Sequence, residues 1–410
     1  MTKETISRRP LQTGTINNRT MQRSNLALVL RTIYDNGGIS RRDVAARTGL
    51  TPSTVTNIVN RLLSDGLVHE DSGAGAESGA VGRRPIRLTV NAARYACIGV
   101  ELSADRITGV LTDFCGAPLA RMDTENDYRD APETAVARIG RVVRALMRDA
   151  GMPRESVLGV GLLSAGPYDR EAGVMLDQTN FEGWTRVPIR DLAREETGLP
   201  VYFDRDSVGC ALDAVAAGGE HDGTLFALLV NTIGIGGALV IDGEVFYGRE
   251  NCASEVGCMT MIPGGPQCRC GDKGCLEAIS AADALLGYIR GRVAEGAEDP
   301  FDGGADRADA SALAAAYRAG RPLAVEAVLR GARYLGVAIG NVIKIVGPDV
   351  IAIGGSFVAV FPEYYDLMVG EAVKRRQVQP RFVPFRHGPI QCAMGGVRLV
   401  VQEYFRSLEE

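Results

Sequence analysis

The sequence contains no run of 18 or more apolar residues, which is the length that a membrane-spanning helix needs. Its first residues, MTKETISRRPLQTG, lack the apolar segment of a secretory signal. It also has no low-complexity tract and no short-period repeat. These absences predict a cytoplasmic protein that does not enter the membrane. In that compartment, its nine cysteines are not expected to form structural disulfides.

The length of 410 residues is too great for one simple domain and fits two or three. Hydrophobic residues make up 46% and charged residues 23%, as in ordinary globular proteins. The net charge of −5 is unevenly distributed: residues 1–95 hold 14 Lys and Arg against 7 Asp and Glu, and the remainder holds 31 against 43. A basic head on an acidic body indicates that the head binds a polyanion; a chance imbalance is the alternative.

Residues 1–20 are polar and unpatterned, which predicts a flexible arm. Residues 21–92 predict three short helices. The first begins near Ser24, Ser40 caps the second, and Thr51 caps the third. Their buried positions would be Leu26, Val29, Leu30, Ile33, Val44, Ala45, Leu50, Val55, Ile58, Val59 and Leu62.

After these helices, residues 67–70 and 86–90 alternate as two strands around a Gly-rich loop. Three helices and such a wing are typical of a winged helix-turn-helix, whose recognition helix would be Thr51–Asp65. Its outward polar residues would be Ser53, Thr54, Thr56, Asn57, Asn60 and Arg61. Arg83 and Arg84, held extended by the following proline, suit a narrow minor groove. We therefore expect double-stranded DNA as a partner; a helical dimerisation module is the alternative.

From residue 95 onward, apolar strands and amphipathic helices alternate and predict two α/β halves. The expected helices are 132–149 and 327–346, and residues 294–310 form an acidic, Gly-rich loop. The expected strands are 96–102, 107–111, 157–163, 201–203, 225–230, 238–241 and 350–353.

Five of the nine cysteines fall between residues 252 and 275. The tight set is Cys258, Cys268, Cys270 and Cys275, with glycines at 271 and 274 that let the chain fold back. Four thiolates in a reducing compartment favour tetrahedral Zn²⁺, and a full ligand set predicts a structural metal. Buried free cysteines are the alternative.

With these motifs, the chain resembles the ROK family of repressors and sugar kinases over nearly all of residues 24–405. Cys-x-Cys-Gly-x-x-Gly-Cys-Leu-Glu at 268–277 and Ala253-Ser-Glu-Val-Gly-Cys258 carry the resemblance, although Cys258 stands where the family usually has a histidine. The resemblance implies an actin-like (RNase H-like) two-lobed α/β domain over 95–410. Its lobes would be roughly 95–210 with the C-terminal helix, and 211–390 with the zinc site.

The resemblance also implies a sugar site. Asp206 matches the catalytic base of the kinases, Glu255 and Glu277 match sugar contacts, and Ser164 and Gly166 belong to a loop bordering the sugar. Asn180 begins a segment that often covers the sugar. Each carboxylate taken alone could equally be a solvated surface charge.

Arg205 departs from the family, which usually has a neutral Asn there. It would either pair with Asp204 or Asp206, or reach the ligand and favour an anionic group. The sequence favours a neutral sugar but leaves an acidic one open.

Kinases of this family hold nucleotide phosphates at a glycine-rich first turn, but here that place reads Glu101-Leu-Ser-Ala-Asp105 and has no glycine. A second Gly-rich turn at 232–237 and Gly354-Gly355 are retained. We therefore expect a sugar-responsive repressor without catalytic activity, acting as a homodimer or homotetramer. The alternatives are an active ATP-dependent sugar kinase with a DNA-binding head, and a DNA-bound scaffold with a ligand-free pocket.

Overall fold

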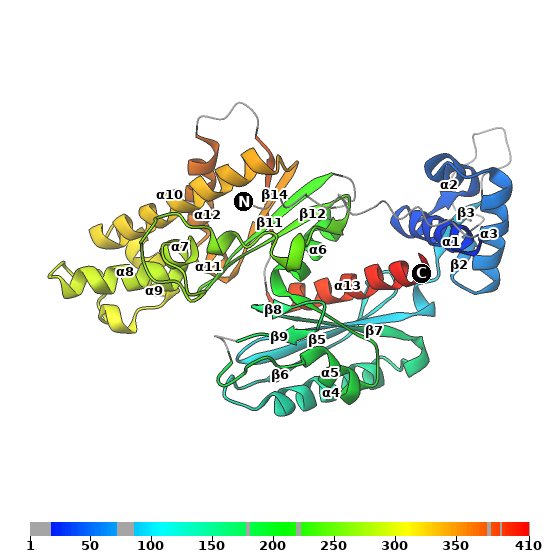
Figure 1. Ribbon diagram of the computed structural model, residues 1–410, viewed down its shortest axis with the longest axis horizontal. Coiled ribbons are helices and arrows are strands. Elements are labelled where there is room, and N and C mark those ends of the chain that lie inside the picture. Colours follow the sequence, from blue (N-terminus) through cyan, green and yellow to red (C-terminus); the bar gives the residue numbers. More distant parts are fainter. Residues whose placement is uncertain are drawn as a thin grey trace, which may run out of the picture. The chain divides into compact units, whose positions relative to one another are not determined.

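The computed structural model describes residues 18–71, 86–177, 181–218, 223–374, 379–385 and 388–409 (Figure 1). It divides the chain into two compact units. Unit 1 comprises Met1–Tyr95 together with Val401–Glu410, and unit 2 comprises Ala96–Val400. No helix in these ranges is long and apolar enough to span a bilayer.

Unit 1 is built on three helices and a small antiparallel sheet of strand order β1-β3-β2. The Ser40 side chain caps α2, as predicted, by accepting a hydrogen bond from the Asp43 N–H. Gly49 ends that helix in the left-handed conformation. Strand β1 was not predicted. The elements are α1 (Asn18–Asp35), β1 (Ile39–Ser40), α2 (Arg41–Thr48), α3 (Pro52–Ser64), β2 (Val68–Asp71), β3 (Arg87–Val90) and η1 (Ala92–Arg94).

Two aromatic pairs join the chain's last residues to the rest of unit 1. The ring of Phe405 meets that of Tyr34 edge-on at 5.5 Å, and Tyr404 lies 5.7 Å from Tyr95. Both residues come from the end of α13 (Pro389–Glu409), whose earlier turns belong to unit 2. The last residues of α13 therefore belong to the core of unit 1.

The first sheet of unit 2 has the order β10-β7-β4-β5-β6. Its three inner strands, β7, β4 and β5, are apolar on both faces because helices cover them. Helix α4 matches its predicted limits because its apolar stripe is regular, whereas β6 was not expected. The elements are β4 (Ala96–Leu102), β5 (Arg106–Asp113), β6 (Pro118–Glu125), α4 (Pro132–Asp149), η2 (Arg154–Ser156), β7 (Val157–Ser164), β8 (Tyr168–Asp169), β9 (Val174–Met175), α5 (Ile189–Thr197) and β10 (Val201–Arg205).

The second sheet of unit 2 has the order β13-β12-β11-β14-β15, and helices α7 to α12 supply its larger core. The acidic loop at 294–310 is a loop, as expected, with one 3₁₀ turn. The remaining elements are α6 (Asp206–Gly218), β11 (Thr224–Val230), β12 (Ile235–Ile241), β13 (Glu244–Val245), η3 (Arg249–Asn251), η4 (Val256–Cys258), α7 (Glu277–Ser280), α8 (Ala282–Ala294), η5 (Ala305–Arg307), α9 (Ala310–Arg318), α10 (Pro322–Ile345), β14 (Val350–Gly354), α11 (Ser356–Val360), α12 (Pro362–Val373) and β15 (Arg381–Pro384).

Helix α13 packs directly against the backbone of the first sheet. A Cβ on Gly99 would lie 1.7 Å from the Ala393 carbonyl oxygen, and one on Gly161 would lie 2.0 Å from that of Gly396. Only glycine permits so close an approach, so Gly99 and Gly161 determine where α13 packs on the sheet.

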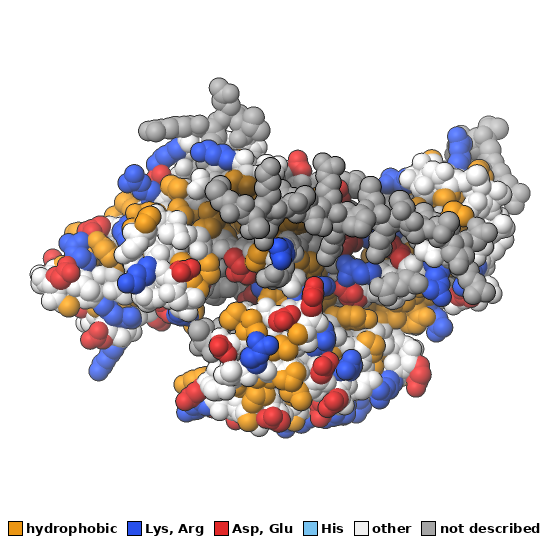
Figure 2. Space-filling model, viewed as in Figure 1, with side chains coloured by type: hydrophobic (Ala, Val, Ile, Leu, Met, Phe, Trp, Pro, Cys, Tyr) orange, Lys and Arg blue, Asp and Glu red, His pale blue; other side chains and the backbone are white. Residues whose placement is uncertain are grey.

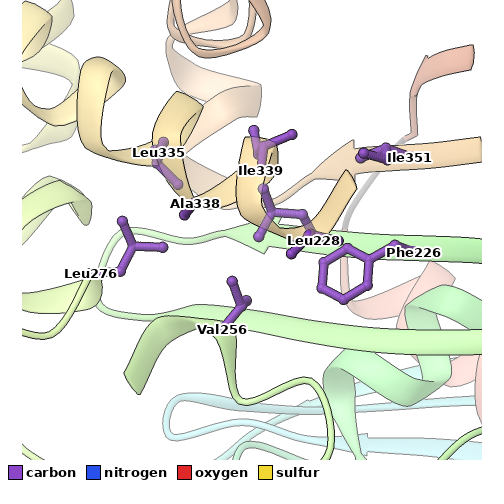
Figure 3. Close-up of a pocket in the computed structure, with 9 residues that line it drawn as sticks. Phe226, Leu228, Val256, Leu276, Leu335, Ala338, Ile339 and Ile351 are labelled. Atoms are coloured by element: carbon purple, nitrogen blue, oxygen red, sulfur yellow. The ribbon is translucent and has the colours of Figure 1, made fainter. Parts of the chain in front are cut away.

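The second sheet's core contains a narrow gap enclosed by nine apolar side chains (Figure 3). Phe226 and Leu228 of β11 face Leu335 and Ile339 of α10 across it. The gap has no room for a water molecule, so we treat it as a packing feature of the core and not as a ligand site.

Candidate functional site

Helix α3 presents a polar face opposite its buried residues. Thr51 caps it, as predicted, by accepting from the Thr54 N–H at 3.2 Å, and Pro52 occupies its first turn. Val55, Val59 and Leu62 are buried. Because 53, 57 and 61 are four residues apart, Ser53, Asn57 and Arg61 share the opposite, exposed face.

The other predicted DNA contacts are partly buried, bonded to other residues of unit 1, or outside the described residues. Thr54 and Thr56 are partly buried, and the Thr56 hydroxyl donates to the Pro52 carbonyl at 2.8 Å. Asn60 accepts a hydrogen bond from Arg41 at 3.1 Å. Arg41 also forms an ion pair with Glu70 at 2.7 Å. Arg83 and Arg84 lie outside the described residues.

Three cysteine thiols converge in the loop that precedes α7. The sulfurs of Cys268, Cys270 and Cys275 all lie within 4.8 Å of one another. Gly274 allows the chain to fold back here, since a Cβ at this position would meet the Ile262 carbonyl oxygen at 1.6 Å.

Cys258, the fourth predicted ligand, is not among the sulfurs that lie within 4.8 Å of one another, although it is close enough to Cys270 for the two thiols to interact. Burial and the neighbouring thiols raise the pKa of Cys258 well above its usual value and that of Cys275 to about 12. The pKa of Cys270 is lowered instead, chiefly by a backbone hydrogen bond from Asp272. Three converging thiols with a fourth nearby could hold a soft metal such as Zn²⁺. Cys252 is not part of this group, because its thiol bonds to the Arg249 carbonyl at 2.9 Å.

The cysteine cluster adjoins two of the predicted sugar contacts. Glu255 begins the 3₁₀ turn that ends at Cys258, and Glu277 follows Cys275 by two residues. A metal held by the thiols would therefore fix both carboxylates. Burial raises the pKa of Glu277, whose carboxylate accepts from the Ile235 N–H at 3.1 Å.

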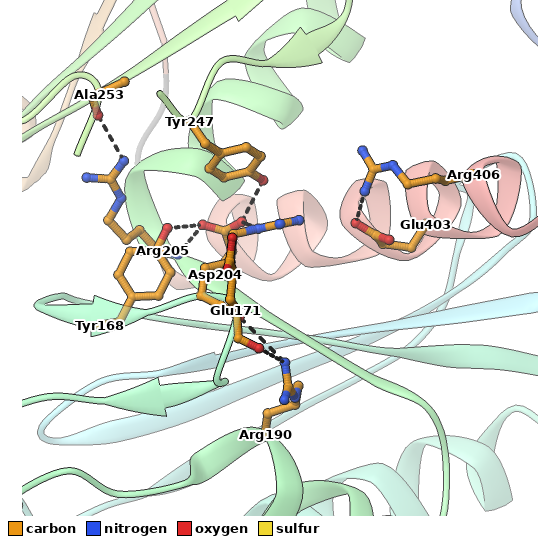
Figure 4. A network of polar contacts seen from close by, with 10 residues as sticks. Tyr168, Glu171, Arg190, Asp204, Arg205, Tyr247, Ala253, Glu403 and Arg406 are labelled. Carbon is orange, nitrogen blue, oxygen red and sulfur yellow. Dashed lines mark hydrogen bonds and ion pairs between the residues drawn. The ribbon is translucent and has the colours of Figure 1, made fainter. Parts of the chain in front are cut away.

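Sequence reasoning missed the most highly connected carboxylate near the site, that of Asp204 (Figure 4). It is fully buried and accepts hydrogen bonds from Tyr168 at 2.8 Å, Tyr247 at 2.6 Å, Arg170 at 3.1 Å and the Arg205 N–H at 2.8 Å. Burial and the Asp204 charge raise the pKa of both tyrosines far above normal, so their hydroxyls stay donors. An acidic residue directly before the Arg205-Asp206 pair was the available signal.

Arg205 pairs with neither of the two aspartates that the sequence suggested. Its Nη1 donates to Glu255. Its Nη2 donates to the Ala253 carbonyl at 3.3 Å (Figure 4). Burial lowers the pKa of Arg205, but Tyr168, Glu255 and the aspartates raise it more, so the guanidinium remains charged.

The other predicted sugar residues lie around this centre. Asp206 opens α6 and accepts from the Ser207 N–H at 2.6 Å. A Cβ on Gly166 would lie 3.8 Å from the Arg205 side chain. Ser164 is buried and donates to the Leu102 carbonyl at 2.8 Å, so its role is in the fold as much as in a site. Asn180 lies outside the described residues.

The turn between β4 and β5, at the place where the sequence resemblance predicts the first phosphate turn, is a tight hairpin. The Ser103 N–H bonds to the Arg106 carbonyl at 2.9 Å, and Asn126 bonds the carbonyls of Ser103 and Asp105 at 2.9 Å. Glu101 hydrogen-bonds Ser103. A turn closed in this way offers two carboxylates and not a row of N–H groups to a phosphate.

Gly355, of the retained Gly354-Gly355 pair, has a structural reason to be glycine. A Cβ on Gly355 would meet the Val230 carbonyl oxygen at 2.2 Å, and Gly355 has φ +124°. Asn231 bridges to the Ser356 N–H at 2.9 Å. Packing alone therefore explains the glycine at position 355.

The model of the ROK family matches residues 97–403. The chain belongs to the ROK family. A winged helix-turn-helix DNA-binding model matches residues 27–69, in agreement with the helices and strands of unit 1.

Both transcriptional repressors and sugar kinases are similar to this ROK protein. The xylose repressor of Caldicellulosiruptor bescii is 29% identical over 368 residues, which cover 89% of this chain and 91% of that protein. The glucokinase of Thermotoga maritima is 30% identical over 267 residues, covering 63% and 81%. A ROK family transcriptional regulator, a homologue of the E. coli MLC protein, superposes with a TM-score of 0.77 at 23% identity, covering 95% of this chain and 98% of that one.

Proposed function

We propose that this protein is a sugar-responsive, DNA-binding transcriptional repressor of the ROK family. The observation that carries the proposal is the presence, in one chain, of a capped recognition helix with Ser53, Asn57 and Arg61 exposed and of a kinase-like sugar site around Asp206. The xylose repressor matches nearly the whole chain, head included, whereas the glucokinase matches only about two thirds of it.

On the DNA side, Asn57 and Ser53 offer hydrogen bonds to base edges, and Arg61 offers a cation to a base or a phosphate. Arg83 and Arg84 of the wing would insert into the minor groove. Figure 2 shows acidic and basic side chains interspersed on the visible face of the described part of unit 2. That face lacks the single-sign field of a DNA-binding surface, which supports placing recognition in unit 1.

On the effector side, Asp206 and Glu277 would accept hydrogen bonds from the hydroxyls of a small carbohydrate, with Glu255, Gly166 and Asn180 bordering it. Sugar binding would change the affinity of the heads for the operator. One small head seldom reaches operator affinity alone, so we propose a homodimer or homotetramer that engages two half-sites.

We further propose that the protein is not a sugar kinase. Its first turn is closed by Asn126 and carries Glu101 and Asp105, which would repel a nucleotide's phosphates. Without a phosphate donor in place, Asp206 serves as a hydroxyl acceptor and not as a base.

Zn²⁺ is proposed as a structural ion held by Cys258, Cys268, Cys270 and Cys275. Bound there, it would supply folding free energy to the loops that carry Glu255 and Glu277. All four positions are taken by protein ligands, so the ion would have no open site for chemistry.

The experiment that tests this function begins by selecting operator DNA from a random duplex library with the purified full-length protein. Binding of the selected duplex is then measured with and without each member of a sugar panel. A sugar that shifts the affinity, and loses its effect in Asp206→Asn, supports the proposal. No selected sequence, or selection that survives Asn57→Ala unchanged, refutes the DNA side.

A further inference from the structure

The guanidinium of Arg205 is a buried cation with a poor partner. Its side chain is 8% exposed, whereas its one ion-pair partner, Glu255, is 52% exposed. Arg205 ends strand β10 of the first sheet, and Glu255 lies in the loop after β13 of the second. The pair therefore joins elements of the two sheets while one of its members remains largely in water.

The hydrogen bonds of Arg205 are also incomplete. Glu255 engages only Nη1, and Nη2 reaches a carbonyl at 3.3 Å. Nε is buried and has no partner among the described residues. Buried guanidinium groups are stabilised best by two parallel bonds to one carboxylate, and an unmade bond in a buried site is costly. The Nε edge of this side chain could therefore bind an acceptor that no described residue supplies.

The neighbouring carboxylates do not supply that acceptor. Asp204 takes four hydrogen bonds, one of them from the backbone N–H of Arg205 and none from its guanidinium. Asp206 accepts from the Ser207 N–H at the start of α6, and Glu277 accepts from the Ile235 N–H.

Resting on the function proposed above, we propose that the effector is a sugar acid whose carboxylate replaces Glu255 on Arg205 and also engages Nε. The exchange is neutral in charge, because one carboxylate leaves for water as another arrives. A phosphate would instead bring a second negative charge beside Asp206, so a carboxylate is the anion that the site favours. The hydroxyls of the same ligand meet Asp206 and Glu277.

This exchange also suggests how binding is sensed. Displacing Glu255 breaks an ion pair between elements of the two sheets, and the ligand then takes over the connection. The protein thus has one set of contacts without the sugar acid and another with it, which a two-state regulator requires.

The test is calorimetric titration of the full-length protein with D-glucuronate and D-galacturonate, against D-glucose, D-galactose and D-xylose, with glucose 6-phosphate as a separate arm. The proposal expects at least one sugar acid to bind tenfold or more tightly than its neutral counterpart and than the phosphate. Arg205→Asn and Arg205→Lys should each lose at least tenfold for the acid, equivalent to about 1.4 kcal/mol. Arg194→Asn, at an exposed site on α5, is the matched control and should bind as wild type.

Glu255→Gln should change the affinity in the opposite direction to the Arg205 variants. This test remains valid even if the Arg205 variants fail to fold. Removing the competing carboxylate should raise the affinity for the sugar acid at least threefold. If Glu255 instead held a neutral sugar, its replacement would lower the affinity. Tight neutral-sugar or phosphate binding with no acid preference overturns this inference and leaves the repressor function standing. Binding by no member of any series overturns both this inference and the proposed sugar site.

Discussion

Tyr247 donates a 2.6 Å hydrogen bond to the buried carboxylate of Asp204, joining the loop after β13 to strand β10. Arg170 stacks on the same tyrosine, with its guanidinium carbon 4.2 Å from the ring centre. Asp204 directly precedes Arg205 and bonds its N–H. The bond from Tyr247 to Asp204 therefore stabilises the candidate effector site.

Replacing Tyr247 with Phe should therefore lower the free energy of unfolding. A hydrogen bond to a charged group is worth about 1.5–3 kcal/mol, and Asp204 would keep its other donors, so we expect a loss near the lower value. Urea denaturation would measure it. Tyr288→Phe is the control, because Tyr288 bonds an exposed glutamate, Glu326, and its loss should cost far less. Equal effects of the two changes would contradict the importance given to Asp204.

Removal of the metal should loosen unit 2 and weaken sugar binding together. Purified protein should hold one zinc ion per chain, and Cys270→Ser should lose it and lower the melting temperature. Because Glu277, a proposed contact for the effector's hydroxyls, adjoins the thiols, the variant should also bind the effector less tightly. Cys115→Ser, at an exposed cysteine outside the cluster, should keep the metal. Protein prepared without chelator and found free of metal would refute the site.

The two kinds of DNA contact should respond differently to substitution. Arg83→Ala with Arg84→Ala should weaken binding to all sequences and reduce the salt slope by roughly two, since each cation releases about one counterion. Asn57→Ala should cost roughly 1–3 kcal/mol on the selected operator and little on random DNA. Anisotropy titrations at several salt concentrations separate the two. An unchanged salt slope in the double variant would show that the wing arginines do not contact phosphates.

Asp213, on α6, gives a prediction of pH dependence. Burial raises the pKa of this carboxyl above its ordinary value, with Arg398 opposing the shift. As pH rises above the unfolded pKa of about 3.9, the unfolded chain loses its proton first, so folding stability falls until the folded group also ionises. Asp213→Asn should therefore stabilise the protein at pH 7 and progressively less towards pH 4. Thermal melts across that range would show it; a gain that is the same at every pH would contradict the assignment to ionisation.

Local structure could be predicted where the chain's own neighbours determine it. The caps at Ser40 and Thr51 and the limits of α4 follow from residues three or four apart, and the structure confirms them. Strand β6 was missed because its exposed positions, at an edge of the sheet, leave only a weak apolar signal.

Partners distant in sequence could not be predicted in the same way. Arg205 was expected to pair with an adjacent aspartate or to meet the ligand, but its partner, Glu255, is 50 residues away in the chain. The Asp204 hydrogen bonds likewise bring together Tyr168, Arg170 and Tyr247, which only the assembled fold places around one carboxylate.

Lack of kinase activity is expected because of the closed first turn. Incubation with ATP and each sugar of the panel should give no phosphorylated product. Turnover with any sugar, abolished by Asp206→Asn, would show that the hairpin at Ser103 opens to admit nucleotide and would restore the kinase alternative.

The most direct test of the central claim is the affinity of the full-length protein for its selected operator, measured by fluorescence anisotropy with and without the effector found by titration. We predict that the effector shifts the dissociation constant at least tenfold. We also predict that Asp206→Asn binds the operator as tightly as wild type but no longer responds. An operator affinity that is the same at saturating effector and without it would contradict the account of this protein as a sugar-responsive repressor.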